Sequence, residues 1–548
     1  MEKWFRPLLV FAILVWFTGI RVDTMDIDAS QYATISREML ETGSYLQVFE
    51  VGRDYLDKPP LLFWVSSLSM KLFGVNNFGY KFPSLLAALL ALWGTWVLAK
   101  RLYNKTIAQL AVLVLAACQG MFLMTNDIRT DTLLMGFTIT AIAYLYCWTE
   151  DKKWGQLFIG FSCIALGMMA KGPVALIVPA LALGVHLVIK RDWKNIFHPA
   201  YILGLIWVGI MLIPMCIGLY QQYDMHPEKE VYGLHGPSGL RFFFWTQSFG
   251  RITGEIYWNN GAGFTFLLEN MLWSFLPWIL VFLWALVVKF ADLIRNRNIA
   301  APGNEWITAG GFVLSYIALG SSKYQLPHYI FVVYPLAAIV TAWFIYRLYE
   351  KHQAGALKTL SGMLWFISIM LFVASGLILG FTFPDNWALW SVYLVAGFAA
   401  MLSLYRNATQ YKVILVSVFA ITWVNGFLTN HFYTNLLQYQ PASVLGRFVH
   451  EHRLPADKVL RYKVDQSMNG VHFYAQHTIG AAETLDGLGK GTYLMTTADG
   501  LKDVTALQLP YRVLIRMQGF RVSALTAEFL NGKTRNAVTT PYFLVELQ

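Results

Sequence analysis

The sequence has few charged residues for its length. Asp, Glu, Lys and Arg make up 14% of the 548 residues, whereas soluble domains carry about 25%. Hydrophobic residues make up 56%, and many of them stand in apolar runs of spanning or near-spanning length. This composition excludes an ordinary soluble domain and indicates a polytopic membrane protein.

Cysteine is scarce as well. The four cysteines lie in apolar segments, so the sequence offers no disulfide framework, and we expect them to be small core residues. The chain also lacks a glycine-rich dinucleotide-binding or phosphate-loop fingerprint, a repeat at a fixed period and a low-complexity segment. The missing fingerprints agree with an activity that uses no nucleotide.

Thirteen apolar segments are long enough, or nearly so, to cross a membrane. Several are shorter than the usual ~20 residues, which helix tilt and a thinner bilayer accommodate. No small-residue cleavage site follows the first segment, so we interpret it as a helix and not as a signal peptide. The predicted spans are 7–22, 81–99, 107–124, 132–148, 155–170, 173–189, 200–219, 266–288, 306–320, 329–346, 359–380, 387–404 and 412–430.

The basic residues predict the orientation of the chain. Most Lys and Arg residues of the short loops fall on one side of the predicted spans, which places the N-terminus in the cytoplasm and, after thirteen spans, the C-terminus outside. The same bias explains the net charge of +10, so we predict no nucleic-acid partner. The opposite short loops hold only Arg129, Lys171 and Lys323.

The composition divides the chain into two predicted domains. Residues 1–435 are expected to form a transmembrane domain with two long outer loops, 23–80 and 220–265. The first loop predicts interfacial helices at 29–42 and 61–73, with Asp28 as the N-cap of the former and Gly43 as its terminator.

Residues 436–548 are more polar and predict a small outer α/β domain. A helix is expected near 442–452, and strands are expected at 458–464, 471–475, 492–497, 511–518 and 542–547. The predicted fold class is therefore a mostly α membrane protein with a small α/β domain at its C-terminus.

A set of charged residues gathers at the predicted outer face of the membrane. Charged groups so close to a bilayer are costly to desolvate and are usually retained for use. A ring of Lys and Arg there suits an anionic phosphate, and a carboxylate among them could act as a general base. The pocket would suit a lipid phosphate whose tail lies between helices. The set comprises Asp28, Asp57, Lys58, Asp127, Arg129, Asp131, Lys171, Arg251, Lys323 and His328.

Simpler roles remain open for several of these residues. Asp28 and Asp131 could cap helices. Lys171 could extend from a helix end to the interface, and Lys323 could be a solvated loop cation. The second outer loop also holds four possible metal ligands, although their spacing is not diagnostic. These four are His226, Glu228, Glu230 and His235.

Five sequence blocks resemble the GT-C class of glycosyltransferases, which use lipid-linked sugars. They are most similar to the family that joins protein O-mannosyltransferases to the aminoarabinose transferases of lipid A. With the spans and the outer domain, the resemblance covers nearly the whole chain. The blocks are DASQYATISREML (28–40), YLDKPPLLFW (55–64), FGVNNFGYKFPS (73–84), AKGPVAL (170–176) and SKYQLPHYIFVVYP (322–335).

The resemblance implies a GT-C fold and a membrane glycosyltransferase. Such an enzyme moves a sugar from a polyprenyl phosphate to an acceptor on the outer leaflet, and lipid A is the acceptor that we favour here. A protein or a glycan remains an alternative acceptor. Because the sugar is already activated on the lipid, no nucleotide is needed. The expected location is the inner membrane of a bacterium, with the site and the C-terminal domain in the periplasm.

The resemblance also implies roles for single residues. Asp28 and Asp131 match two acids of the family and are expected to be catalytic, with Asp28 accepting the proton of the acceptor. Asp57 stands where the family usually has Glu, and it would support a divalent metal or the donor phosphate.

The donor phosphate is expected to leave in a single, inverting displacement, stabilised by basic side chains. The residues expected to bind it are Lys58, Lys171, Arg251 and Lys323.

Two other classes of protein remain alternatives. A transporter or flippase would also have many spans, but transporters typically show paired halves and ionisable residues near mid-span. Here the charges collect at one face. A polysaccharide ligase or polymerase of the outer leaflet would lack the YLDKPP block (55–60).

Overall fold

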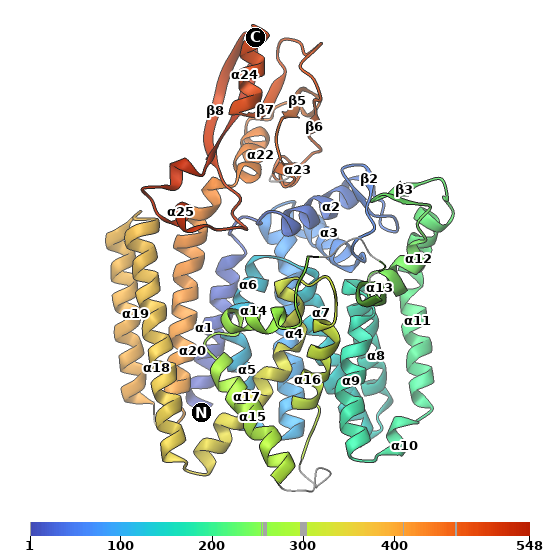
Figure 1. Cartoon of the computed structure of the whole chain (residues 1–548), viewed down its shortest axis with the longest axis vertical. Helices are drawn as coiled ribbons and strands as arrows, with labels where there is room; N and C mark the ends of the chain where they lie inside the picture. The colour runs from blue at the N-terminus through green and yellow to red at the C-terminus, as the bar shows by residue number, and fades with distance from the viewer. Residues whose placement is uncertain (1, 254, 256–259, 296–303, 409, 466–467) are drawn as a thin grey trace.

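The helices stand largely side by side in one bundle, and a small sheet domain lies at one end of it (Figure 1). This computed structural model describes all residues except 1, 254, 256–259, 296–303, 409 and 466–467, and it leaves out the side chains of residues 251, 252, 293 and 294. The prediction of a mostly α fold is confirmed.

Within the described residues, eight segments are long and apolar enough to cross a membrane. A ninth results when α5 (Lys105–Ala116) and α6 (Gln119–Asn126), which meet at 55°, are counted as one broken span. The eight are α4 (Asn77–Leu102), α7 (Thr130–Asp151), α8 (Trp154–Lys171), Trp193–Asp224 with α10 (Trp193–Ile196) and α11 (Ala200–Leu219), Pro327–Glu350 with α17 (Tyr334–Glu350), Ala354–Thr382 with α18 (Ala354–Leu377), α19 (Trp387–Asn407), and Lys412–Tyr439 with α20 (Lys412–Phe427).

The other predicted spans also fall on helices, but these do not meet the same criteria. The helices are α1 (Glu2–Gly19), α9 (Val174–Ile189), α14 (Phe266–Ser274), α15 (Ile279–Arg295) and α16 (Ala309–Gly320). A multi-pass membrane protein is thus confirmed, whereas the number of thirteen spans stays a prediction.

Close helix packing in the bundle relies on small residues. A Cβ atom on Gly136 of α7 would lie 2.5 Å from the backbone oxygen of Ala87 in α4. Small residues at such crossings let membrane helices approach closely and gain dispersion contacts. At the rim of the bundle, Phe366, Val392 and Val395 are exposed, as expected for helices that face lipid tails.

Both predicted helices of the first outer loop are present. These are α2 (Asp28–Thr42) and α3 (Leu61–Phe73), and Gly43 ends α2 with a left-handed φ of 73°. The predicted cap is wrong, because Ile27 occupies the N-cap position and the Asp28 carboxylate contacts Arg129 instead. Asp28 thus forms an ion pair with the largely buried guanidinium of Arg129 and does not cap α2.

The second outer loop folds into short elements near the outer end of α11. They include the π-helical turns η1 (Tyr220–Asp224) and η2 (Phe242–Thr246), the two-stranded ribbon β3 (Glu230–Val231) and β4 (Leu234–His235), and the helices α12 (Gly239–Arg241) and α13 (Phe249–Thr253). Figure 1 shows these elements close to α2 and α3, at the end of the bundle that carries the sheet domain.

The C-terminal part contains a five-stranded sheet with the order β6-β5-β7-β9-β8. The pairs β6–β5 and β5–β7 are parallel, and the pairs β7–β9 and β9–β8 are antiparallel. The strands are β5 (Val459–Tyr462), β6 (Gly480–Ala481), β7 (Tyr493–Thr497), β8 (Tyr511–Gly519) and β9 (Thr540–Leu547), and the helices beside them are α22 (Pro441–Glu451), α23 (Val471–Tyr474), α24 (Ala498–Ala506) and α25 (Ala527–Leu530).

Four of the five predicted strands and the predicted helix near 442–452 are confirmed in this part. The strand predicted at 471–475 is wrong, because these residues form the helix α23. All four residues of α23 are buried, and a short continuous apolar run cannot distinguish a buried strand from a buried helical turn.

Hydrogen bonds join the C-terminal part to the chain just before α2. The buried Gln440 amide donates to the Thr24 carbonyl at 2.9 Å and accepts from the Asp26 backbone N–H at 3.0 Å. The Tyr474 hydroxyl accepts from the Thr24 N–H at 2.6 Å. These contacts, defined here as the seam, fix the chain that leads into Asp28.

The Asp26 carboxylate is buried in the seam. It accepts a hydrogen bond from the Ser30 hydroxyl at 2.8 Å, and a Cβ atom on Gly470 would lie 3.2 Å from it. Burial raises the pKa of Asp26 to about 8, against the hydrogen bond from Ser30, and the nearby Asp465 carboxylate raises it further. A buried carboxylate of this kind is neutral near pH 7.

Gly136→Ala is expected to destabilise the bundle, because the new methyl group would overlap the Ala87 carbonyl of α4. Overpacking of this kind costs about 1–3 kcal/mol, which should appear as a lower thermal unfolding midpoint in detergent. Gly184→Ala in α9 is the matched control, because nothing lies within 4 Å of a Cβ atom there. Equal midpoints for the two variants would contradict the close crossing of α4 and α7.

Asp26 predicts a pH dependence of stability. Its pKa of about 8 lies above the ordinary value of 3.8, so its stabilising contribution is complete below about pH 4 and is lost as the pH rises to about 8. The thermal midpoint should therefore fall more steeply from pH 5 to pH 8 in the wild type than in Asp26→Asn. Asp457→Asn, at an exposed position, should follow the wild type. Parallel pH profiles for wild type and Asp26→Asn would refute the role of Asp26.

Candidate functional site

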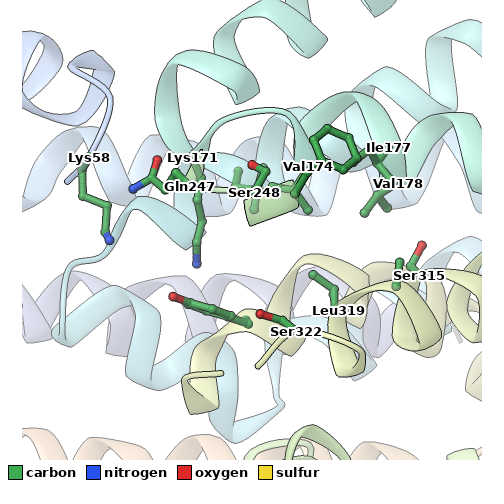
Figure 2. A pocket seen from close by; sticks show the side chains of 14 residues that line it. Lys58, Lys171, Val174, Ile177, Val178, Gln247, Ser248, Ser315, Leu319 and Ser322 are labelled. Carbon is green, nitrogen blue, oxygen red and sulfur yellow. The ribbon is translucent and has the colours of Figure 1, made fainter. Parts of the chain in front are cut away.

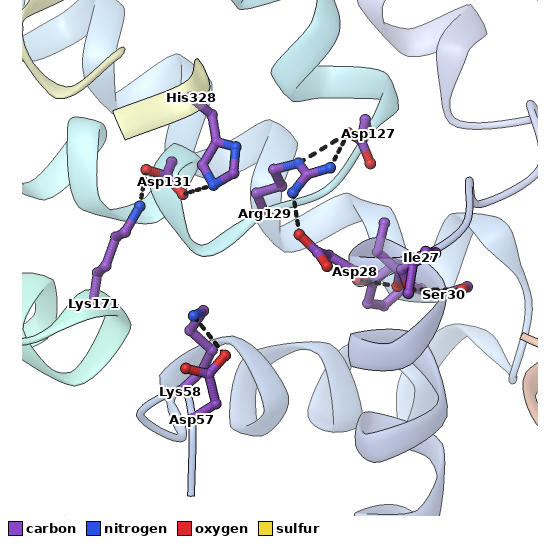
Figure 3. A network of polar contacts seen from close by, with 12 residues as sticks. Ile27, Asp28, Ser30, Asp57, Lys58, Asp127, Arg129, Asp131, Lys171 and His328 are labelled. Carbon is purple, nitrogen blue, oxygen red and sulfur yellow. Dashed lines mark hydrogen bonds and ion pairs between the residues drawn. The ribbon is translucent and has the colours of Figure 1, made fainter. Parts of the chain in front are cut away.

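Arg129 lies between the carboxylates of Asp127 and Asp28, near the start of α2 (Figure 3). Its Nε donates to Asp127 at 2.9 Å, and its Nη1 contacts Asp28 at the start of α2. Burial alone would lower the pKa of Arg129, but the carboxylates of Asp127 and Asp28 outweigh burial and raise it. The Asp28 side chain stays 37% exposed, so its carboxylate is held in place and can still be reached by a substrate.

Asp131 lies in the first turn of α7, and its side chain is only 1% exposed. It does not cap α7, because Arg129 occupies the N-cap position. One carboxylate oxygen contacts the Lys171 ammonium, and the other lies 3.6 Å from Nε2 of His328. Asp131 thus has two basic neighbours from two other elements.

Lys171 is the last residue of α8, which ends at Gly172 with φ 90°. Its Nζ lies 3.9 Å from the centroid of the Tyr329 ring, which is a cation–π distance. The left-handed turn at Gly172 and the following Pro173 fix where the lysine stem leaves the helix. The Lys171 side chain is 13% exposed, so it retains some access to solvent.

Asp57 and Lys58 lie in the turn before α3. Lys58 Nζ donates to one oxygen of Asp57 at 2.7 Å, and the Gln247 amide donates to the other at 3.2 Å. In the part of the chain that the structure describes, no three His, Cys, Asp or Glu side chains gather as metal ligands. With both oxygens of Asp57 engaged, a metal at Asp57 stays a prediction.

The possible ligands of the second outer loop form two separate pairs. His226 lies 2.8 Å from Glu228, and His235 lies 3.7 Å from Glu230 on the β3–β4 ribbon. All four side chains are well exposed. The arrangement explains them as surface ion pairs that form when the histidines are protonated.

A cavity opens beside these charged groups, with Lys58 and Lys171 at one end (Figure 2). Its walls are mainly apolar and come from α9 and α16, for example Val174, Val178 and Leu319. Gln247 also lines it, on the side of Lys58. The cavity therefore joins a basic end to an apolar passage between two helices.

Several of the predicted site residues lie close together. The buried hydroxyl of Tyr32 illustrates this: burial raises its pKa well above the ordinary value, and the carboxylates of Asp28, Asp57 and Asp131 raise it further. Figure 3 shows Asp28 directed toward Arg129, Lys171 toward Asp131, and Lys58 beside Asp57.

Arg251 and Lys323 are the other two residues that the sequence predicts to bind the phosphate. The side chain of Arg251 lies outside the described residues, although Phe249 of the same helix, α13, lines the cavity. Lys323 is exposed, and its neighbour Ser322 lines the cavity in its place. The roles of both residues remain predictions.

The sequence did not single out Gln247 or Tyr329 as site residues. Tyr329 follows His328 in the SKYQLPHY motif. Its position next to predicted basic residues could have indicated that it belongs to the site. Gln247 offered no such indication, because a single amide in a loop carries no characteristic spacing.

The chain is similar in sequence to known proteins. Residues 57–217 match a family described as dolichyl-phosphate-mannose-protein mannosyltransferase. The chain is also similar to an undecaprenyl phosphate-α-4-amino-4-deoxy-L-arabinose arabinosyl transferase of Edwardsiella ictaluri, with 27% identity over 63% of this chain and 61% of that protein. The alignment thus spans less than two thirds of that relative.

A second such arabinosyl transferase, from an Enterobacter species, is 23% identical over 80% of this chain and 74% of that protein. Among solved structures, the crystal structure of ArnT from Cupriavidus metallidurans bound to undecaprenyl phosphate matches with a TM-score of 0.73 and 20% identity. The match covers 99% of this chain and 98% of that one, so the two share one fold over their whole length.

Proposed function

We propose that this chain, a GT-C class protein of the protein O-mannosyltransferase and aminoarabinose transferase type, transfers a sugar from a polyprenyl phosphate to lipid A. The observation that carries the proposal is the cavity with Lys58 and Lys171 at one end and apolar walls from α9 and α16 beyond them. A lipid phosphate needs both parts: cations for its head and an apolar passage for its tail.

The comparisons support this choice of donor. The similar arabinosyl transferases are named for an undecaprenyl phosphate-linked sugar, and the Cupriavidus ArnT structure contains undecaprenyl phosphate. In this chain the phosphate would lie between Lys58 and Lys171, and the prenyl tail would follow the wall formed by Val174 and Val178.

The transfer would be a single displacement with inversion. The acceptor oxygen attacks the anomeric carbon while the bond from that carbon to the donor phosphate oxygen breaks. Polyprenyl phosphate leaves with the bonding electron pair, stabilised by Lys58 and Lys171. The Asp28 carboxylate takes the proton of a hydroxyl acceptor, or it orients a phosphate acceptor that needs no base.

Arg129 and Asp131 would act through these groups. Arg129 holds the Asp28 carboxylate in position. Asp131, whose side chain is 1% exposed, supports Lys171 from inside the protein. The role that we give Asp131 in catalysis is therefore indirect, through the lysine.

We place the protein in the inner membrane of a bacterium, with its N-terminus in the cytoplasm. The support is the excess of Lys and Arg in the short loops of one side. In this orientation the cavity mouth, the second outer loop and the C-terminal domain lie in the periplasm, where a polyprenyl-linked sugar and lipid A would meet.

Asp28→Asn is expected to lower transfer about 10²- to 10⁴-fold, because the amide cannot accept a proton. The measurement is mass spectrometry of lipid A and surface proteins from cells that carry no active gene, the wild-type gene or the variant. Wild type should restore a pentose- or hexose-sized increment on lipid A, and the variant should not.

The same measurement tests the proposed acceptor. An increment that appears on a protein would replace lipid A with a protein acceptor of the same enzyme class. Full restoration by Asp28→Asn would remove Asp28 as the base, and no sugar increment on any molecule would favour a transporter.

Lys58→Ala and Lys171→Ala are each expected to weaken donor binding about 10- to 100-fold, because each removes a hydrogen bond to a charged group. The KM for the lipid-linked donor should rise, while the KM for the acceptor stays within about 2-fold, because only the donor phosphate lies between the two lysines. Lys490→Ala, at an exposed position in the C-terminal part, is the matched control. Equal effects on both substrates would contradict the phosphate role.

A further inference from the structure

The two oxygens of Asp131 are held unequally. Lys171 contacts Oδ1 closely, whereas Nε2 of His328 lies 3.6 Å from Oδ2, which exceeds the usual length of an N–H···O hydrogen bond. Lys171 is therefore the main ion-pair partner of Asp131, and His328 lies near the other carboxylate oxygen. Figure 3 shows Asp131 between the two basic side chains.

Lys171 has a second task in the proposed function, on which this inference rests. It lines the donor cavity, where it would bind the phosphate of the lipid. An ammonium group that turns toward a phosphate loosens its contact with Asp131. The Asp131 side chain is 1% exposed, so water cannot replace the lost partner, and an unpaired buried carboxylate is strongly unfavourable.

We propose that His328 is a positioning residue. It donates a hydrogen bond to the Asp131 carboxylate when Lys171 turns to the donor phosphate. An approach of about 0.5 Å would bring Nε2 into hydrogen-bond range of the carboxylate. A neutral or a protonated imidazole can supply the N–H that this requires. His328 lets Lys171 move without leaving a buried charge unpaired.

The surroundings of His328 fit this role. Its ring packs edge-on against the Tyr329 ring at 5.2 Å, and Tyr329 in turn lies beneath the Lys171 ammonium. His328 stands in the first turn of the 3₁₀ helix η3 (Pro327–Val333), directly after Pro327. The proline fixes its own φ at the start of η3, which limits the backbone freedom next to His328.

The test is direct binding of undecaprenyl phosphate to the purified full-length protein in detergent, without any transfer reaction. His328→Phe removes the N–H donor and should weaken binding about 10-fold or more, because Lys171 then stays on Asp131. His328→Gln keeps an N–H donor and should change binding by less than about 3-fold.

A double-mutant cycle separates this role from direct contact with phosphate. On the background of Asp131→Asn the buried charge is absent, so His328→Phe should have no further effect on binding. Equal losses for His328→Phe and His328→Gln, or additive losses in the double variant, would overturn the proposal.

Two controls keep the outcome clear. Lys58→Ala tests the donor site itself: if it leaves binding unchanged, the proposed function fails, whereas a loss for Lys58→Ala with no loss for His328→Phe refutes only the role of His328. The thermal midpoint of each variant without lipid checks that it folds. His328→Ala, which adds no bulk, replaces His328→Phe in the cycle if the phenylalanine variant does not fold.

Discussion

The end of the bundle near the sheet domain depends on one guanidinium that lies between two carboxylates. Arg129 joins Asp127, in the loop before α7, to Asp28, at the start of α2 and 101 residues away in sequence. Charges that are largely withdrawn from water persist only when they are paired and hydrogen-bonded. The ion pair therefore ties the first outer loop to the helix bundle, and it does so at the one carboxylate of the group that stays substantially exposed.

Asp57 and Asp131 are likewise paired with neighbouring polar or basic side chains. Asp57 is engaged by Lys58 and Gln247, and Asp131 by Lys171 with His328 nearby. Lys58 and Lys171, the two lysines that line the cavity, are thus already in contact with a carboxylate. In the proposed function, the phosphate of the donor would compete with these internal carboxylates for the two ammonium groups. In the proposed function, a neutral lipid would bind less well than an anionic one, because it could not compensate the loosened carboxylate contacts.

The sequence predicts the elements of this protein better than it predicts their contacts. Apolar runs located the helices of the bundle, and period and turn signals located α2, α3 and four strands, since these features depend on neighbouring residues. The short strand β6 and the helix α23 were not predicted, because a few buried residues show no clear hydrophobic periodicity. Loop topology alone predicts that the charged residues lie at one face of the membrane, and several of them lie close together at one end of the bundle. Which acid pairs with which base could not be predicted, since the contact of Asp28 with Arg129 depends on how distant segments pack.

The seam gives the C-terminal part a role in the geometry of the site. Gln440 and Tyr474 hold the backbone of Thr24 and Asp26 from positions more than 400 residues away in the sequence. Those two residues directly precede the segment that ends at Asp28. The C-terminal part therefore helps to fix the position of the Asp28 carboxylate. The helix bundle and the C-terminal part are consequently not interchangeable. A chimera that took its helices from one relative and its outer domain from another would have to carry Gln440, Tyr474 and the 24–28 segment as one inherited unit.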